Sequence, residues 1–247
     1  MRGRGRNLMS PVSRVMIPVG AGALACEIHL PDKLPSPAVV CCHGLLSSKD
    51  STKYLSIAEE LRAVGIAAVR FDFSGAGECT APLGPNLLES WLRDLDAVLG
   101  YVRARTWMAG PLGLLGSSMG GYVSLLMRDS GRHPVNALVC WSTPFRLERI
   151  RAALEDGDEL AHVFPAGFKL GHPQTLASLG PIPGILVIHG QEDDLVHWEQ
   201  ATDIYRRLGE PRNLVLLRTA EHRILDPEWR RLALRLSVDW FRERFST

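Results

Sequence analysis

Short, continuous apolar segments alternate with amphipathic helical patterns along most of this 247-residue chain, and this alternation is the strongest constraint on its fold. A strand that is covered by helices on both faces is apolar throughout, as buried parallel strands are. Repeated passage from strand to helix to strand predicts a parallel sheet with helices on both sides. The segments that predict such strands are 37–44, 65–73, 110–117, 135–142, 184–190 and 213–219.

Apolar residues at three- and four-residue spacing predict helices between these strands. In the last helical segment, Trp229, Leu232, Leu236 and Trp240 form one such stripe. The opening segments 13–19 and 22–30 predict an antiparallel hairpin at the edge of the sheet. The fold class is therefore α/β, with a doubly wound, mostly parallel sheet of about eight strands. Helices are predicted at 51–65, 86–105, after Ser118, at 197–209 and at 226–245.

The length of the chain fits one large α/β domain, and hydrophobic residues make up 46% of it, enough for a sizeable core. Three arginines, Arg2, Arg4 and Arg6, stand near the start, but prolines and polar residues interrupt the apolar run that an export signal would need. We therefore expect residues 1–12 to be a disordered basic N-terminus and residues 13–247 to form a single domain.

Charge and cysteine content exclude several classes of partner. The 28 Lys and Arg residues balance 27 Asp and Glu residues, so no overall field draws nucleic acid or an anionic membrane. The five cysteines are odd in number and lack CxxC spacing, which is typical of free thiols in a reducing compartment and not of a zinc site. We expect a cytoplasmic protein that binds neither nucleic acid nor membrane, uses no metal or cofactor and acts on a small molecule; the sequence leaves a homodimer open.

The segment GSSMG, at 116–120, follows an apolar strand and precedes a helix. It fits G-x-S-x-G with Ser118 at the centre, and small flanking residues are needed where a serine occupies a sharp strand-to-helix turn. A plain tight turn would also use glycine. The position between strand and helix favours a nucleophile over a plain turn.

Acidic and basic groups follow the next strands at the same edge of the predicted sheet. Glu192, Asp193 and Asp194 come after the strand at 184–190, and His222 comes after the strand at 213–219. A serine needs a base to accept its proton, and the base needs a carboxylate to orient it. Spacing alone leaves all three acids open, and His197 is an alternative base.

The loop after the first parallel strand, CCHGLLSS, lies beside the nucleophile turn in a doubly wound sheet. We expect the backbone N–H groups of Leu45 and Met119 to form an oxyanion hole. His43 is expected to shape this loop through a side-chain hydrogen bond. Ser117 is expected to point away from the crevice.

These motifs together resemble the α/β-hydrolase superfamily, and in particular small serine esterases that include feruloyl-esterase-like members. The resemblance extends from about Ala38 to the end of the chain and rests on an HG loop, a D-x-x-G-x-G-x-S segment, GxSxG, HGxxDxxV and a late histidine. It implies the α/β-hydrolase fold and a triad of Ser118, Asp193 and His222. Two positions depart from the pattern: Cys79 replaces the last serine of the glycine loop, and His197 replaces a proline.

An insertion at about 143–183 separates the fourth and fifth parallel strands, where the resembled fold carries a lid. Phe145, Phe164 and Phe168 are the candidates for lining a substrate pocket beneath it; the alternative is a solvated helical excursion. The leading hypothesis is a serine hydrolase that cleaves a carboxylic ester through an acyl-enzyme. Thioester or peptide cleavage by the same triad, or a receptor-like binding protein with slow turnover, are the alternatives.

Overall fold

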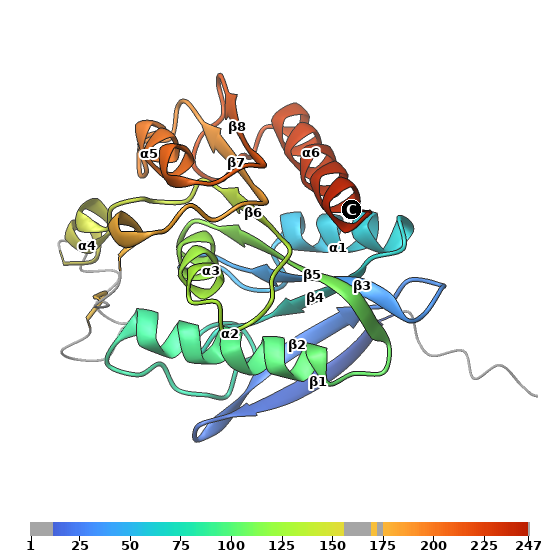
Figure 1. The fold of residues 1–247 in the computed structure, drawn as a ribbon. Coiled ribbons are helices and arrows are strands. Elements are labelled where there is room, and N and C mark those ends of the chain that lie inside the picture. The colour runs from blue at the N-terminus through green and yellow to red at the C-terminus, as the bar shows by residue number, and fades with distance from the viewer. Residues whose placement is uncertain (1–11, 156–168, 172–174, 247) are drawn as a thin grey trace, which may run out of the picture.

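The computed structural model describes residues 12–155, 169–171 and 175–246, and it is built around one eight-stranded sheet (Figure 1). The strand order is β1-β2-β4-β3-β5-β6-β7-β8, in which β1, β2 and β4 pair antiparallel and all later pairs are parallel. The predicted fold class is confirmed. The strands are β1 (Val12–Val19), β2 (Gly22–His29), β3 (Ser36–Cys42), β4 (Ala67–Phe71), β5 (Met108–Ser117), β6 (Ala137–Trp141), β7 (Ile185–Gly190) and β8 (Arg212–Leu217).

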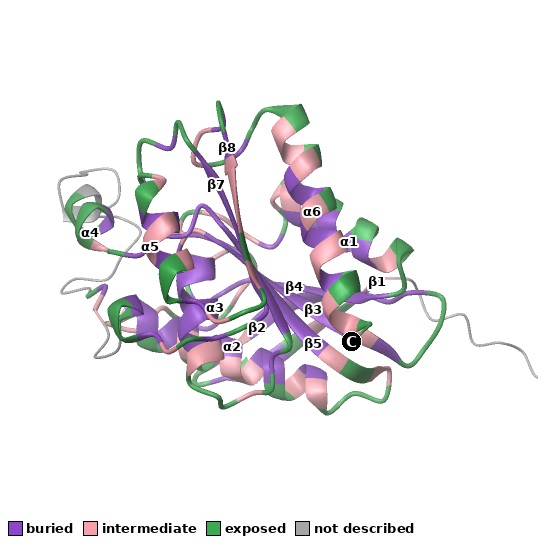
Figure 2. Cartoon of the chain, turned by 45° about the horizontal axis from the view of Figure 1, so that its top comes forward, coloured by how far each residue is buried: buried purple, intermediate pink, exposed green. Residues whose placement is uncertain are grey.

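The helices cover both faces of the sheet (Figures 1 and 2). One apolar cluster joins α1 and α6 to one face, and a second joins α2, α3 and α5 to the other. Both clusters include strand residues that are almost completely buried, as a parallel sheet between two helical layers requires. The helices are α1 (Thr52–Ala63), α2 (Leu87–Arg103), α3 (Met119–Asp129), α4 (Glu148–Glu155), α5 (Glu199–Arg207) and α6 (Pro227–Phe245), with a 3₁₀ turn η1 (Leu176–Ser178).

The contact of α6 with the sheet differs in detail from the predicted stripe. Trp229 and Trp240 of that stripe are only half-buried, whereas Ala233, Ser237 and Phe241 are completely buried. The small side chains of Ala233 and Ser237 allow the helix to approach the strands closely. There the indole N–H of Trp141, on β6, donates to Ser237 Oγ at 3.0 Å.

The strand boundaries move by a few residues, for local reasons. The strand predicted at 65–73 begins only at Ala67, because Gly65 has a φ of +85° and turns the chain out of α1. It ends at Phe71, because the Asp72 side chain accepts the backbone N–H groups of Lys49 and Glu78 and turns the chain away from the sheet. Among the described residues, no helix combines the length and hydropathy needed to cross a membrane.

Helix α3 lies against the end of β3 at a distance that only glycine permits. A Cβ atom on Gly120 would stand 2.1 Å from the carbonyl oxygen of Cys42 and 2.4 Å from that of His43. Backbone atoms cannot move aside as a flexible side chain would. The start of α3 therefore depends on the absence of a side chain at this position.

We predict that Gly120→Ala lowers the free energy of unfolding by more than about 2 kcal/mol, because the added methyl group overpacks a rigid backbone contact. Urea unfolding followed by circular dichroism measures the change. Gly100→Ala is the matched control, because Gly100 lies in α2 with no atom near its would-be Cβ. That substitution should leave stability equal or raise it by up to about 1 kcal/mol through helix propensity. Equal stability of the two variants would contradict the proposed close contact.

Candidate active site

Ser118 occupies a strained turn between β5 and α3. Its φ of +53° and ψ of −124° lie in a region that non-glycine residues rarely adopt, and its N–H donates to the carbonyl of Trp141 at 2.8 Å. A Cβ on Gly116 would stand 2.5 Å from the Cα of Gly121, so the chain could not fold back on itself with a larger residue there. The flanking glycines are thus what allows the serine to stand at the tip of the turn.

His222 joins Ser118 to a buried carboxylate. The imidazole Nε2 lies 3.2 Å from Ser118 Oγ, and Nδ1 lies 2.8 Å from Asp193 Oδ2. With the proton on Nδ1 donated to the carboxylate, Nε2 presents a lone pair to the serine hydroxyl. Three residues from the ends of β5, β7 and β8 are therefore placed in one hydrogen-bonded chain.

Asp193 is held as an anion by several donors. Its Oδ1 accepts the backbone N–H groups of Leu195 at 3.1 Å and Val196 at 2.8 Å. His189 Nε2 lies 3.1 Å from Oδ2. Burial raises the pKa of Asp193, but the hydrogen bonds from His189 and His222 outweigh it and lower the pKa to about 2. The carboxylate is therefore charged and fixed before any substrate arrives.

The structure distinguishes between the alternatives that spacing left open. Glu192 and Asp194 are exposed, and within the described parts of the chain Asp193 is the carboxylate that hydrogen-bonds His222. His197 is exposed and lines a different depression, together with Arg146 and Glu148. His197, which stands where the resembled pattern has proline, thus has its imidazole away from Ser118.

The HG loop lies against Ser118, and His43 shapes the loop. His43 Nε2 accepts the N–H of Phe73 at 3.0 Å, so its protonated Nδ1 donates to the Gly44 carbonyl at 2.8 Å. Burial lowers the pKa of His43 to about 4, which keeps it neutral. A Cβ on Gly44 would stand 3.1 Å from Ser118 Cβ, and Leu45 lines the pocket next to it. Leu45 and Met119, the predicted oxyanion donors, thus belong to the two segments that meet at Ser118.

The glycine loop 72–79 wraps the buried carboxylate of Asp72. Lys49, whose side chain is also buried, places its ammonium 3.2 Å from Asp72 Oδ2 and 2.6 Å from Glu78. A Cβ on Gly77 would stand 2.2 Å from Asp72 Oδ2. Cys79, where the resembled pattern has serine, uses its thiol as a donor to the Ala23 carbonyl at 3.3 Å. The replacement of serine by Cys79 therefore keeps a hydrogen-bond donor at this position.

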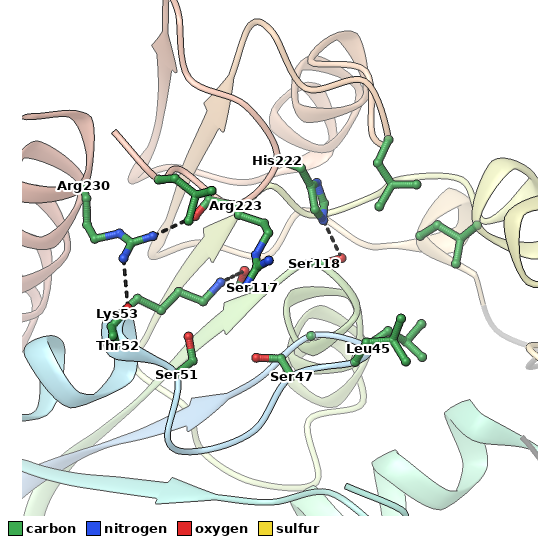
Figure 3. A pocket seen from close by; sticks show the side chains of 15 residues that line it. Leu45, Ser47, Ser51, Thr52, Lys53, Ser117, Ser118, His222, Arg223 and Arg230 are labelled. Carbon is green, nitrogen blue, oxygen red and sulfur yellow. Dashed lines mark hydrogen bonds between the residues drawn. The ribbon is translucent and has the colours of Figure 1, made fainter. Parts of the chain in front are cut away.

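A pocket of about 370 Å³ opens beside Ser118 (Figure 3). Leucines and Ile150 of α4 supply its apolar wall, while Lys53, Arg223 and Arg230 supply positive charge. The expectation for Ser117 is wrong: its side chain lines this pocket, and its Oγ accepts a hydrogen bond from Lys53 Nζ at 2.7 Å. The lining residues are Gly44, Leu45, Leu46, Ser47, Ser51, Thr52, Lys53, Ser117, Ser118, Ile150, Leu195, His222, Arg223, Leu225 and Arg230.

The three basic residues of this pocket were not singled out from the sequence. Arg223 directly follows His222, and this adjacency was an available signal. Lys53 and Arg230 are brought together by the packing of α1 against α6, where Arg230 donates to Thr52 Oγ1 at 3.0 Å. No sequence pattern marks that contact.

The predicted lid residues are only partly described. Phe164 and Phe168 lie outside the described residues. Phe145 is buried, and the guanidinium groups of Arg146 and Arg207 lie 5.6 and 5.2 Å from its ring centre. It is not among the residues that line the pocket beside Ser118. In the described ranges of the chain, no group of three or more His, Cys, Asp and Glu side chains could hold a metal ion.

Comparison with known proteins relates this site to hydrolases. Residues 33–166 match the family described as "Serine aminopeptidase, S33". The human palmitoyl-protein thioesterase ABHD10, mitochondrial, is 26% identical over 214 residues, which cover 76% of this chain and 68% of that protein. Among solved structures, Est1E from Butyrivibrio proteoclasticus with bound ferulic acid has a TM-score of 0.78 at 18% identity, covering 94% of this chain and 100% of that one.

Mouse ABHD10 superposes with a TM-score of 0.72 at 22% identity, over 94% of this chain and 99% of its own. The structural likeness at these identities concerns the fold, while the family match spans more than half of the sequence. The protein therefore belongs to the serine aminopeptidase S33 family and is a hydrolase of the α/β-hydrolase superfamily.

Proposed function

We propose that the protein hydrolyses carboxylic esters through an acyl-enzyme on Ser118. The observation that carries this proposal is the hydrogen-bonded chain from Ser118 Oγ through His222 to Asp193, with the serine at a positive-φ turn on the pocket wall. A hydroxyl with a base at one side and an open pocket at the other is arranged for nucleophilic attack.

In the first half-reaction, Ser118 Oγ adds to the substrate carbonyl while His222 Nε2 accepts its proton. The imidazolium that forms is stabilised by Asp193, whose Oδ2 lies 2.8 Å from Nδ1 and accepts its proton in a hydrogen bond. The backbone N–H groups of Leu45 and Met119 would donate to the carbonyl oxygen as it becomes negative. His222 then gives the proton to the departing oxygen, which leaves as an alcohol.

In the second half-reaction, a water molecule takes the place of the alcohol. His222 accepts a proton from this water, which attacks the acyl carbonyl, and the same proton returns to Ser118 Oγ as the acid leaves. Each residue therefore acts twice, and no group besides the triad and the two N–H donors is needed.

Thioester hydrolysis is the second candidate, and the similarity to palmitoyl-protein thioesterase ABHD10 supports it. The triad treats both substrate classes alike until the leaving group departs. A thiolate leaves with less need of a proton than an alkoxide, so comparison of matched oxygen and sulfur esters separates the two. The family description makes peptides a third arm of the same comparison.

We predict that Ser118→Ala lowers kcat for p-nitrophenyl butyrate by on the order of 10⁶, because the nucleophile of a triad is removed. The measurement is steady-state release of p-nitrophenol, together with labelling by a fluorophosphonate and peptide mapping of the adduct. Ser117→Ala, which keeps the nucleophile, should retain labelling at Ser118. Turnover of a few per cent or more by a clean Ser118→Ala preparation would contradict the assignment.

We predict that Asp193→Asn lowers kcat by about 10⁴, because an amide at this position favours the wrong tautomer of His222. The matched controls are Glu192→Gln and Asp194→Asn, which change exposed neighbours on the same loop. Both should leave kcat nearly unchanged. A larger loss from either control than from Asp193→Asn would move the orienting carboxylate to that residue.

We predict that kcat/KM falls at acid pH, because a general base must be neutral to accept a proton. Asp193, with its pKa lowered to about 2, stays ionised over this range and sets no second step. A pH–rate profile from about pH 4 to about pH 9 measures the midpoint. His197→Gln should leave the profile unchanged, while His222→Gln should abolish activity; the reverse pair of results would make His197 the base.

A further inference from the structure

Three cationic side chains line the pocket beside Ser118 and form no salt bridge with any carboxylate that the structure describes. Lys53, Arg223 and Arg230 all line it. Within the described ranges, the hydrogen bonds of the Lys53 and Arg230 side chains go to neutral acceptors: Ser117 Oγ for Lys53, and Thr52 Oγ1 and the carbonyls of Ile224 and Arg223 for Arg230. Neither these residues nor Arg223 form a salt bridge with a described carboxylate. Among the described residues, these three cations therefore have no paired carboxylate at the cavity.

Two acids of the loop and helix next to His222 hydrogen-bond backbone groups and no pocket cation. Glu221 contributes a favourable field at Lys53, but its carboxylate oxygens accept the backbone N–H groups of Arg223, at 2.6 Å, and of Leu225. Asp226 caps α6 by accepting the N–H groups of Glu228 and Trp229. Asp226 thus stabilises the start of α6. Glu221 stays in the loop that carries His222 and offsets the pocket cations only in part, since the pKa of Lys53 remains lowered.

These like charges also act on one another. Burial, followed by the charges of Arg230 and Arg223, lowers the pKa of Lys53 to about 8. A negative group bound between them would relieve this repulsion. An arrangement that costs energy when empty and is relieved by an anion is characteristic of an anion-binding site.

The first turn of α1 adds to the same field. Ser51, Thr52 and Lys53 line the pocket, and the first turn of this twelve-residue helix contains no acidic residue. The positive end of the helix dipole therefore borders the same cavity as the three cationic side chains.

The cations line the same pocket as Ser118 and His222. Lys53 Nζ lies 2.7 Å from the Oγ of Ser117, which immediately precedes the nucleophile. Figure 3 shows Lys53 and Arg230 on one side of Ser118 and Leu45 on the other. Leu46, Leu195 and Ile150 extend the apolar part of the lining. A substrate that fills this pocket would meet apolar surface in one part and positive charge in another.

We propose that the substrate is an ester or thioester that carries a carboxylate or a similar anionic group, and that Lys53, Arg223 and Arg230 form the subsite for that group. The proposal rests on the proposed function and adds the chemical class of substrate. The anion belongs either to the acyl part or to the leaving alcohol, and the test includes both.

The first measurement compares pairs of substrates in which one member carries a free carboxylate and the other carries its neutral methyl ester. The kcat/KM for mono-p-nitrophenyl adipate, which carries a free carboxylate, is compared with that for its neutral methyl ester. A second pair, 4-acetoxybenzoate and its methyl ester, places the carboxylate on the leaving alcohol. We expect a preference of about tenfold for the anion in at least one pair, as charge-assisted hydrogen bonds provide. No preference in either pair overturns the proposal.

The second measurement asks whether the cations cause the preference. Lys53→Met and Arg223→Met should each lower the ratio of anionic to neutral kcat/KM by several-fold. Arg235→Met is the matched control, since Arg235 is an exposed arginine on α6 that does not line the pocket. It should keep the ratio. Added salt should lower the ratio of the unmodified enzyme, because screening weakens the charge interaction and leaves the neutral substrate unaffected.

Fluorophosphonate labelling of Ser118 in each variant shows that the nucleophile is still assembled. A loss of the preference for anionic substrates can then be distinguished from a loss of the fold. A ratio that resists both substitutions and salt overturns the subsite. If Ser118-dependent hydrolysis occurs without anion preference, the substrate class is wrong and the esterase function stands. If no ester or thioester is hydrolysed and Ser118 is not labelled, both proposals fail.

Discussion

The strained turn at Ser118 is the constraint on which the rest of the site depends. Holding a serine at φ +53° costs on the order of 1–3 kcal/mol, so the surrounding structure must offset that cost. It does so with close backbone packing: Gly116 lies against Gly121, and Gly120 against the carbonyls of Cys42 and His43. The same packing places the HG loop beside the nucleophile. The lack of side chains at Gly116, Gly120 and Gly121 therefore determines both the exposure of the Ser118 hydroxyl and its distance from the predicted oxyanion donors.

The position of the Asp193 carboxylate has a second energetic cost. His189 is completely buried, and its Nε2 is shared between the Val196 carbonyl at 2.8 Å and Asp193 Oδ2 at 3.1 Å. Its Nδ1 has no partner among the described residues. An unpaired buried acceptor costs on the order of 1–3 kcal/mol, which is a loss for stability alone. In return, His189 contacts Asp193 Oδ2 while the Val196 N–H donates to Oδ1. The two contacts hold the carboxylate that hydrogen-bonds His222 in a fixed orientation. The motif HGxxD thus carries a positioning histidine as well as the acid.

Sequence patterns predicted most of the fold because a buried parallel sheet imposes apolar strands at regular intervals, and these are visible without any tertiary information. The same patterns located Ser118 and His222, since each follows a strand end. They could not choose among Glu192, Asp193 and Asp194, because that choice depends on which side chain the loop turns inward. They placed Ser117 on the wrong side, because the contact that holds it comes from Lys53, 64 positions earlier. Long-range packing of this kind has no local periodicity to reveal it.

The net charge of the chain is a second property of the sequence that does not predict the site. A formal charge of +1 argues against a strong overall field, and it says nothing about how charges are paired. Arg70 is buried and paired with Glu27 and Asp50, and Lys49 is buried and paired with Asp72 and Glu78. These acids balance the two buried cations, which would be costly if they were unpaired. The pocket beside Ser118 is different because Lys53 and Arg230 meet neutral acceptors there. An unpaired charge at such a place is costly for stability, and in our proposal the anionic group of the substrate supplies the counter-ion.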